Sequence, residues 1–206
     1  MTNLLTDRPV ILASASPRRL MLLRQIGIEP QVLPAEIKEI NPRPERPPHE
    51  LVSKNSLIKA LAAKKCLGEK DAWIIAADTV VVVDNKILGK PKNPEEACKM
   101  LRLLSGRWHH VLSGLCLLDG LSGKQLCGCA VTKVHFSQLS DEEILSYVKT
   151  GEPRDKAGSY GMQGQAALFV DRIEGDYSTV VGMSLPLLRV LLKRTTQIEP
   201  AEDPGH

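Results

Sequence analysis

Residues 11–19 read ILASASPRR, and they predict an apolar strand that turns at once into a helix. Ser16 suits the N-cap position of that helix, and Pro17 suits its first position, where the missing N–H has no cost. Unpaired backbone N–H groups and the positive end of the helix dipole gather at such a helix start. The first strand and the first helix therefore meet at a candidate anion site.

The side chains of this turn favour a phosphate-rich ligand. Ser14 and Ser16 offer hydroxyl groups, and Arg18 and Arg19 offer guanidinium groups that match phosphate oxygens two at a time. The alternative interpretation is a well-capped helix whose arginines point into water. The two serines favour the anion site over this alternative.

Strands and helices follow one another along the rest of the chain, as apolar spacing, capping residues and glycine positions indicate. The expected helices are residues 17–26, 50–66, 94–105, 141–149 and 185–192. The expected strands are residues 31–33, 73–83, 87–91, 109–118, 126–136 and 166–170. The run 73–83 is apolar almost throughout, which is typical of a strand that is covered on both faces.

The composition narrows the class of protein. The chain has 206 residues, of which 43% are hydrophobic and 25% are charged, as is ordinary for a globular domain. Aromatic residues make up only 3%, which argues against a protein that stacks the bases of single-stranded nucleic acid. The net charge of +3 is mild and the basic residues form no run, so we expect no nucleic-acid partner.

The cysteines and the apolar segments of the sequence indicate in which cellular compartment the protein is expected. The sequence has five cysteines, without paired CxxC spacing, no signal peptide and no long apolar segment. Free thiols without an export signal predict a cytoplasmic protein with no membrane partner. Cys127 and Cys129 fall on one face of an expected strand, where we expect them to be buried small hydrophobic residues, because a zinc site needs more ligands. Residues 197–206 have the composition of a disordered tail after a single domain at 1–196.

Asp78 is the acidic residue that the pattern singles out. It lies inside the apolar run 73–83 and is followed by Thr79. A carboxylate in such a place is unfavourable unless it is paired, hydrogen-bonded or bound to a metal ion. It could hold Mg²⁺ or activate a water molecule. The alternative is a buried aspartate that caps a nearby turn.

Further candidates come from residue type and neighbourhood. Lys59 lies among apolar neighbours, and Lys90 follows the expected hairpin in the sequence GKP. Either lysine taken alone is more simply interpreted as a solvated surface residue. Glu36 and Glu39 are candidate metal ligands by residue type only.

The glycine-rich segment 155–164 is the last candidate. Closely spaced glycines allow the backbone to approach a ligand. Gln163 carries both a donor and an acceptor, which suits the edge of a nucleobase. A plain loop is the alternative.

These separate pieces occur in the order of one family, and the chain resembles the Maf nucleoside triphosphate pyrophosphatases. The resemblance extends from Val10 to about Leu192, and several dispersed motifs in order are more specific than any one of them. The motifs are SASPRR at 14–19, KA at 59–60, ADTV at 77–80, GKP at 89–91, LSG at 104–106, DKAG at 155–158 and YGMQG at 160–164.

The resemblance implies a fold and a reaction. The fold is an elongated α/β structure, in which helices flank a mixed twisted sheet and two lobes enclose a cleft, similar to the inosine triphosphate pyrophosphatases. The reaction is hydrolysis of a nucleoside triphosphate to the monophosphate and pyrophosphate with a divalent metal ion, either Mg²⁺ or Mn²⁺. The family also implies a homodimer.

The resemblance implies roles for the matched residues. Asp78 is implied as the general base, and as a metal ligand together with Glu39. Binding of the triphosphate or its metal ion is implied for Ser14, Ser16, Arg19, Lys59 and Lys90. Base preference is implied for Arg18, Thr79 and Gln163.

The segment 155–164 resembles the subtype that acts on dTTP and UTP. The alternatives are a pyrophosphatase for 7-methyl-GTP or for a modified nucleotide, such as a modified pyrimidine nucleotide, and a nucleotide-binding regulator of cell division or septation. The chain departs from the family pattern at Ser56, where alanine is usual, and at Ser184, where proline is frequent. Neither departure weakens the interpretation as an enzyme.

Overall fold

The computed structural model of the protein describes residues 8–34, 37–43 and 46–196. The expected tail 197–206 and the candidate ligand Glu36 lie outside the described residues. The helices are α1 (Pro17–Gln25), α2 (Pro48–Leu67), α3 (Pro94–Leu104), α4 (Asp141–Lys149), α5 (Tyr177–Val181) and α6 (Leu185–Thr196). The strands are β1 (Val10–Leu12), β2 (Gln31–Val32), β3 (Trp73–Val83), β4 (Lys86–Leu88), β5 (Trp108–Asp119), β6 (Gln125–Phe136) and β7 (Val170–Glu174).

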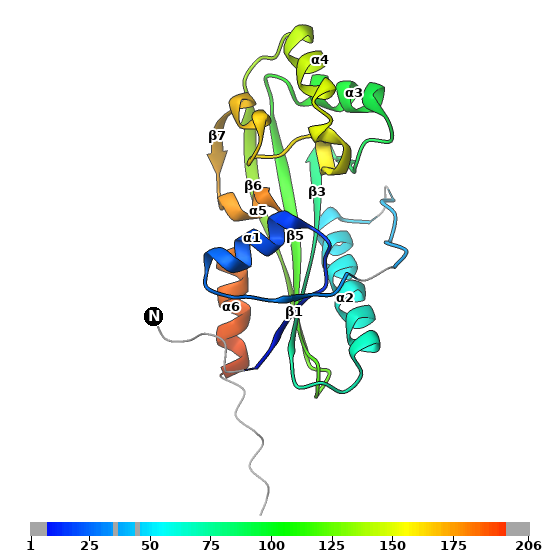
Figure 1. Ribbon diagram of the computed structural model, residues 1–206. Coiled ribbons are helices and arrows are strands. Elements are labelled where there is room, and N and C mark those ends of the chain that lie inside the picture. The colour runs from blue at the N-terminus through cyan, green and yellow to red at the C-terminus, as the bar shows by residue number, and fades with distance from the viewer. Residues whose placement is uncertain (1–7, 35–36, 44–45, 197–206) are drawn as a thin grey trace, which may run out of the picture.

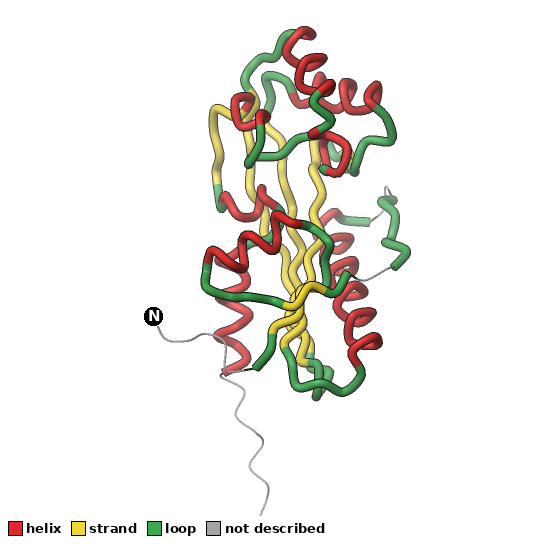
Figure 2. Tube along the Cα trace, viewed as in Figure 1, coloured by secondary structure: helices red, strands yellow, loops and turns green. Residues whose placement is uncertain are grey.

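Within the described residues, the strands form one mixed sheet of seven strands. Its order is β2-β1-β3-β5-β6-β7, with β4 paired to β3. The pairs β1–β2 and β1–β3 are parallel, whereas β3, β5, β6 and β7 pair antiparallel. Figure 2 shows these strands as a long central spine with helices around it. The elongated α/β fold with a mixed sheet and flanking helices is confirmed.

Both faces of β3 are covered, as its apolar sequence predicts. Ile74 and Ala76 pack with Ala60 and Ala63 of α2. On the opposite face, the core contains apolar side chains from β3, α1 and α6: Ile75, Ala77, Leu22, Leu23, Leu188 and Leu191. Figure 1 shows α2 on one side of the sheet, α1 and α6 on the other, and α3 and α4 at the far end of the long strands. The middle of β3 therefore lies between two groups of helices.

Helix starts follow the capping patterns to different degrees. A complete capping box precedes α4, in which the Ser140 side chain accepts from the Glu143 N–H and the Glu143 side chain accepts from the Ser140 N–H. Before α3 one half of a capping box is present, because the Asn93 side chain accepts from the Glu96 N–H. The Glu96 side chain accepts from the Lys92 N–H rather than from the Asn93 N–H. Ser16 occupies the N-cap position of α1, but its side chain makes no capping hydrogen bond.

The structure corrects two expectations about the end of the chain. Residues 166–170 were expected as a strand, but a 3₁₀ helix covers Gln165–Phe169, and strand β7 begins at Val170. Ala166 and Phe169 are both buried, and their spacing of three matches the 3₁₀ repeat rather than the alternation of a strand. Helix α5 was not expected, because one short turn, capped by Asp176, leaves little periodic signal.

Cys127 is a third correction. It was expected to be buried, but it is exposed, whereas Cys129 beside it is half-buried. Helix α2 packs chiefly over β3 and β5 and covers β6 less, which leaves Cys127 on β6 exposed.

Of the described helices, none is long and apolar enough to cross a membrane.

His109 is buried beside the core that contains Leu104 of α3 and Ile144 of α4. Its Nε2 atom lies 2.7 Å from the Tyr160 hydroxyl, and its ring contacts Phe136 edge to face. Burial lowers the pKa of His109 from 6.5 to about 4. Between these two pH values the unfolded chain binds a proton that the folded protein excludes. Acidification through this window therefore destabilises the fold.

We expect His109→Gln to remove this acid sensitivity, because glutamine does not titrate and can still bond the Tyr160 hydroxyl. In the wild type, the free energy of unfolding should fall by about 3 kcal/mol from this group alone as pH drops through the window. Urea unfolding at a series of pH values measures the slope. The exposed His110→Gln is the matched control and should keep the wild-type slope. An unchanged slope in His109→Gln would contradict the assignment.

Candidate active site

A cleft of about 610 Å³ opens beside the middle of β3. Its walls come from the start of α1, from α2, from the segment after β2, from residues 155–162 and from the end of α5. Among the described residues, five basic side chains line it: Arg18, Arg19, Lys59, Lys90 and Lys156. Three acidic side chains of the described residues line it: Glu39, Asp78 and Asp155. Within this part of the chain, the excess of positive charge suits an anionic ligand.

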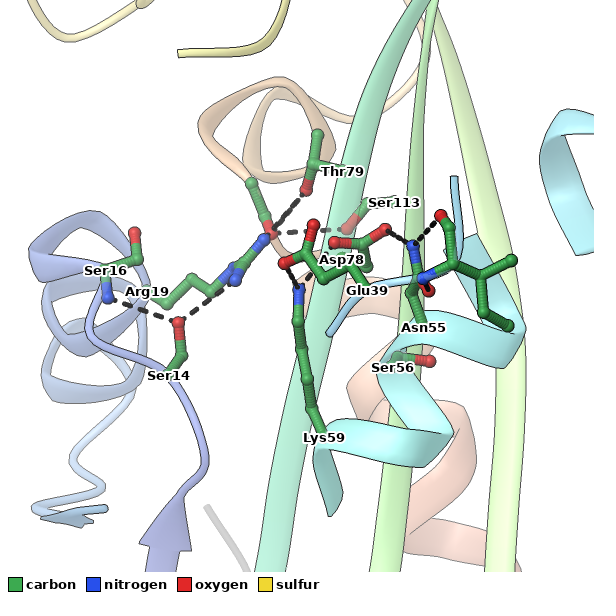
Figure 3. A network of polar contacts seen from close by, with 12 residues as sticks. Ser14, Ser16, Arg19, Glu39, Asn55, Ser56, Lys59, Asp78, Thr79 and Ser113 are labelled. Atoms are coloured by element: carbon green, nitrogen blue, oxygen red, sulfur yellow. Dashed lines mark hydrogen bonds and ion pairs between the residues drawn. The ribbon is translucent and has the colours of Figure 1, made fainter. Parts of the chain in front are cut away.

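Two carboxylates and one lysine form the centre of the cleft. Lys59 Nζ lies 2.6 Å from Asp78 Oδ1 and 2.7 Å from Glu39 Oε1, so the ammonium group bridges the two acids (Figure 3). Asp78 is 6% exposed and Lys59 is 9% exposed, whereas the Glu39 side chain is about half exposed. A buried charge pair of this kind is stable only when both charges are compensated, as they are here.

Helix α2 reaches this point because β5 lets it approach. Asp78 pairs with Gly114 in the ladder between β3 and β5. A Cβ atom on Gly114 would lie 2.2 Å from the carbonyl oxygen of Val52 in α2, so only glycine permits this packing. Lys59 and Asn55 are four residues apart and share one face of α2. The close packing brings both side chains to Asp78.

Asn55 is the site residue that sequence reasoning missed. Its Nδ2 donates to Asp78 Oδ2 at 3.0 Å and to the Ile40 carbonyl at 3.4 Å, and its Oδ1 accepts from the Ile40 N–H at 2.8 Å. It is 3% exposed. One buried amide thus fixes the Asp78 carboxylate and joins it to the segment that carries Glu39. The only sequence signal is a polar residue on a helix face that packs against the sheet.

The electrostatic surroundings favour an ionised Glu39. Partial burial would raise the pKa of Glu39, but the hydrogen bond from Lys59 and the charges of Lys59, Lys90 and Arg19 outweigh burial and lower it. The carboxylate is therefore negative at neutral pH.

Arg19 joins the first turn to the sheet. Its Nε donates to the Gly182 carbonyl at 2.9 Å, its Nη1 to Ser14 Oγ at 3.0 Å and its Nη2 to Thr79 Oγ1 at 3.2 Å. Burial lowers the pKa of Arg19, but a guanidinium keeps its charge in proteins. The Thr79 hydroxyl donates to the same Gly182 carbonyl at 3.0 Å. A guanidinium has five N–H donors, so two remain for a ligand after these three bonds.

The remaining predicted residues fall into two groups. Ser16, Arg18 and Lys90 line the cleft, and Arg18 pairs with Asp155 at 3.4 Å. Lys90 is exposed and makes no hydrogen bond or ion pair with the described residues, which leaves its ammonium group for a ligand. Gln163 is exposed and does not line the cleft, although Met162 beside it does. Among the predicted residues that the structure describes, all but Gln163 therefore line the cleft.

Comparison with known proteins identifies the family. A family model described as Maf-like protein matches residues 9–195. The chain is 44% identical over 187 residues to a dTTP/UTP pyrophosphatase of Dictyoglomus thermophilum, covering 91% of this chain and 96% of the relative. It is 48% identical over 188 residues to a dTTP/UTP pyrophosphatase of a Geobacillus species, covering 89% and 95%.

A solved structure shares the fold. The HAM1 protein from Coxiella burnetii matches with a TM-score of 0.53 at 17% identity, covering 91% of this chain and 99% of that protein. The order of motifs around the cleft, the matched family model and the close relatives agree. The chain belongs to the Maf family.

Proposed function

We propose that this protein hydrolyses dTTP and UTP to the nucleoside monophosphate and pyrophosphate. The observation that carries the proposal is the buried Asp78, held by Lys59 and Asn55 in a cleft rich in basic side chains. The relatives at 44% and 48% identity are named for this activity. A triphosphate and a pyrimidine base are therefore the substrate that we assign to the cleft.

The reaction needs a general base and cationic groups that stabilise negative charge. A water molecule attacks the α-phosphorus, its proton passes to an oxygen of Asp78, and a new phosphorus–oxygen bond forms. The bond from the α-phosphorus to the bridging oxygen breaks, and its electron pair leaves with pyrophosphate. Arg19, Lys59 and Lys90 stabilise the charge on the transferring and leaving groups.

The acidic residues fit a divalent cation that the substrate helps to bind. Glu39 and Asp78 meet at one lysine ammonium, and Mg²⁺ is often held by one or two carboxylates together with substrate phosphates. Among the described residues, no group of three or more acidic, histidine or cysteine side chains could hold a metal ion alone. Mg²⁺ or Mn²⁺ bound there would neutralise phosphate charge.

A substrate panel tests the proposal. Pyrophosphate release is measured from dTTP, UTP, the other common nucleoside triphosphates and 7-methyl-GTP, with Mg²⁺, with Mn²⁺ and with a chelator. We expect fast, metal-dependent release from dTTP and UTP. Preference for 7-methyl-GTP would indicate the other subtype, and tight binding with negligible release would indicate a nucleotide-binding regulator.

The homodimer and the cytoplasmic location stay predictions. Light scattering of the purified protein tests whether it is a homodimer.

We expect Asn55→Leu to lower kcat about tenfold to one-hundredfold with little change in KM. Leucine has a similar volume, but it cannot hold the Asp78 carboxylate, and one lost buried hydrogen bond is worth about 1–3 kcal/mol. Ser56→Ala is the matched control, since the Ser56 hydroxyl donates to the Ser53 carbonyl. Equal kcat in Asn55→Leu and Ser56→Ala would contradict the positioning role.

We expect Gln163→Ala to change base preference more than it changes turnover of the best substrate. The ratio of kcat/KM between UTP and a purine triphosphate is the measurement. Gln165→Ala is the matched control, because Gln165 is also exposed and lies two residues away. Gln163 does not line the cleft, so its role requires residues 160–164 to close on the base. An unchanged ratio would remove Gln163 from base recognition.

A further inference from the structure

Two cysteines outside the cleft face each other across adjacent strands. Cys116 on β5 and Cys127 on β6 are direct partners in the antiparallel ladder. Directly opposed residues in such a ladder have Cα atoms about 4.5–5.5 Å apart, which lies within the range that a disulfide spans. Their sulfur atoms are 2.6 Å apart, and both residues are free thiols. This separation is close to the S–S bond length of about 2.05 Å.

The two thiols differ in exposure and in pKa, as the attacking and resolving cysteines of a redox pair do. Cys127 is exposed, whereas Cys116 is buried in the core beneath α2. The contact with the Cys116 sulfur lowers the pKa of the Cys127 thiol. The same contact, together with burial, raises the pKa of Cys116. An accessible cysteine with increased thiolate character beside a second thiol is the arrangement found in redox-sensitive proteins.

We propose that Cys116 and Cys127 form a reversible disulfide on reaction with low-molecular-weight disulfides such as oxidised glutathione. The Cys127 thiolate attacks one sulfur of the oxidant, a mixed disulfide forms, and one reduced thiol leaves. Cys116 loses its proton and attacks the Cys127 sulfur, which forms the cross-strand bond and releases the second reduced thiol. Two protein thiols are oxidised and one oxidant disulfide is reduced, so the exchange balances.

The other three cysteines do not share this arrangement, and Cys98 is buried on α3. Cys66 is exposed on α2 without a contact to another sulfur atom in the part of the chain that the structure describes. Cys129 follows two residues after Cys127, but it pairs with Gly114 in the ladder. Burial raises the pKa of Cys129 to about 11, so it is a poor nucleophile near neutral pH. We therefore expect oxidation to select one pair.

Trypsin makes the link easy to detect. Lys124 lies between the two cysteines, so digestion separates residues 108–124, which carry Cys116, from residues 125–133, which carry Cys127 and Cys129. The reduced full-length protein is treated with oxidised glutathione, remaining thiols are alkylated, and the digest is analysed by mass spectrometry. We expect the two peptides to be joined, with no retained glutathione, and to separate again on reduction.

Serine substitutions test which cysteine attacks the oxidant and which cysteine resolves the mixed disulfide. Cys116→Ser should stop at a stable glutathione adduct on Cys127, because the resolving thiol is absent. Cys127→Ser should form neither the adduct nor the link, whereas Cys66→Ser and Cys129→Ser should behave like the wild type. A stable glutathione adduct on wild-type Cys127, a link that survives in Cys127→Ser, or no reaction at either residue would overturn the proposal. None of these readouts depends on nucleotide hydrolysis.

Discussion

Asp78→Asn is expected to lower kcat for dTTP by about 10²–10⁴-fold, the range that a positioned general base contributes. Asparagine keeps the shape of the side chain but cannot take a proton from the attacking water. The fold should persist, because Lys59 keeps its ion pair with Glu39 and Asn55 can still bond an amide oxygen. Steady-state pyrophosphate release and a urea unfolding curve measure the two effects separately.

Asp84→Asn is the matched control for this substitution. Asp84 is exposed in the turn between β3 and β4, does not line the cleft and pairs with Arg107. Its left-handed backbone, with φ of 47°, tolerates asparagine. We expect its turnover to match the wild type. Retention of wild-type turnover in Asp78→Asn would remove Asp78 from the role of base.

Lys59→Met is expected to have the second largest effect, and it acts on both stability and rate. Methionine has a similar length, so packing is kept, but Asp78 is left as a buried carboxylate without its cation. Breaking a buried pair from one side destabilises a protein by about 3–5 kcal/mol. Loss of a cation near the developing charge should lower kcat by about 10²–10³-fold.

A double-mutant cycle separates the charge from the packing. In Lys59→Met combined with Asp78→Asn, no carboxylate is left at position 78, so we expect less destabilisation than the sum of the single variants. Lys65→Met, at an exposed position on the same helix, is the matched control and should leave stability within about 0.5 kcal/mol of the wild type. Strict additivity in the cycle would contradict a direct pair between Lys59 and Asp78.

The sequence predicts the parts of the site that depend on local pattern. The apolar run of β3 makes its acidic member conspicuous, so Asp78 stands out by the contrast with its neighbours along the chain. The turn before α1 likewise combines strand, proline and arginines within a few residues. In each case the signal lies in neighbouring residues, and the structure places them at the cleft as expected.

The parts that depend on long-range packing were not predictable. Asn55 reads as an ordinary polar residue of a helix, and its contact with Asp78 exists because α2 packs against Gly114 of a distant strand. The pairing of Lys59 with Glu39 depends in the same way on how the segment after β2 returns to α2. Gln163 shows the reverse, because a residue singled out by its motif lies outside the cleft.

We propose that water attacks the α-phosphorus in this cleft. Hydrolysis of dTTP in water labelled with the heavy oxygen isotope tests it most directly, with the products separated and weighed by mass spectrometry. We expect one labelled oxygen in the thymidine monophosphate and none in pyrophosphate. Label in pyrophosphate, or formation of the diphosphate with inorganic phosphate, would contradict it.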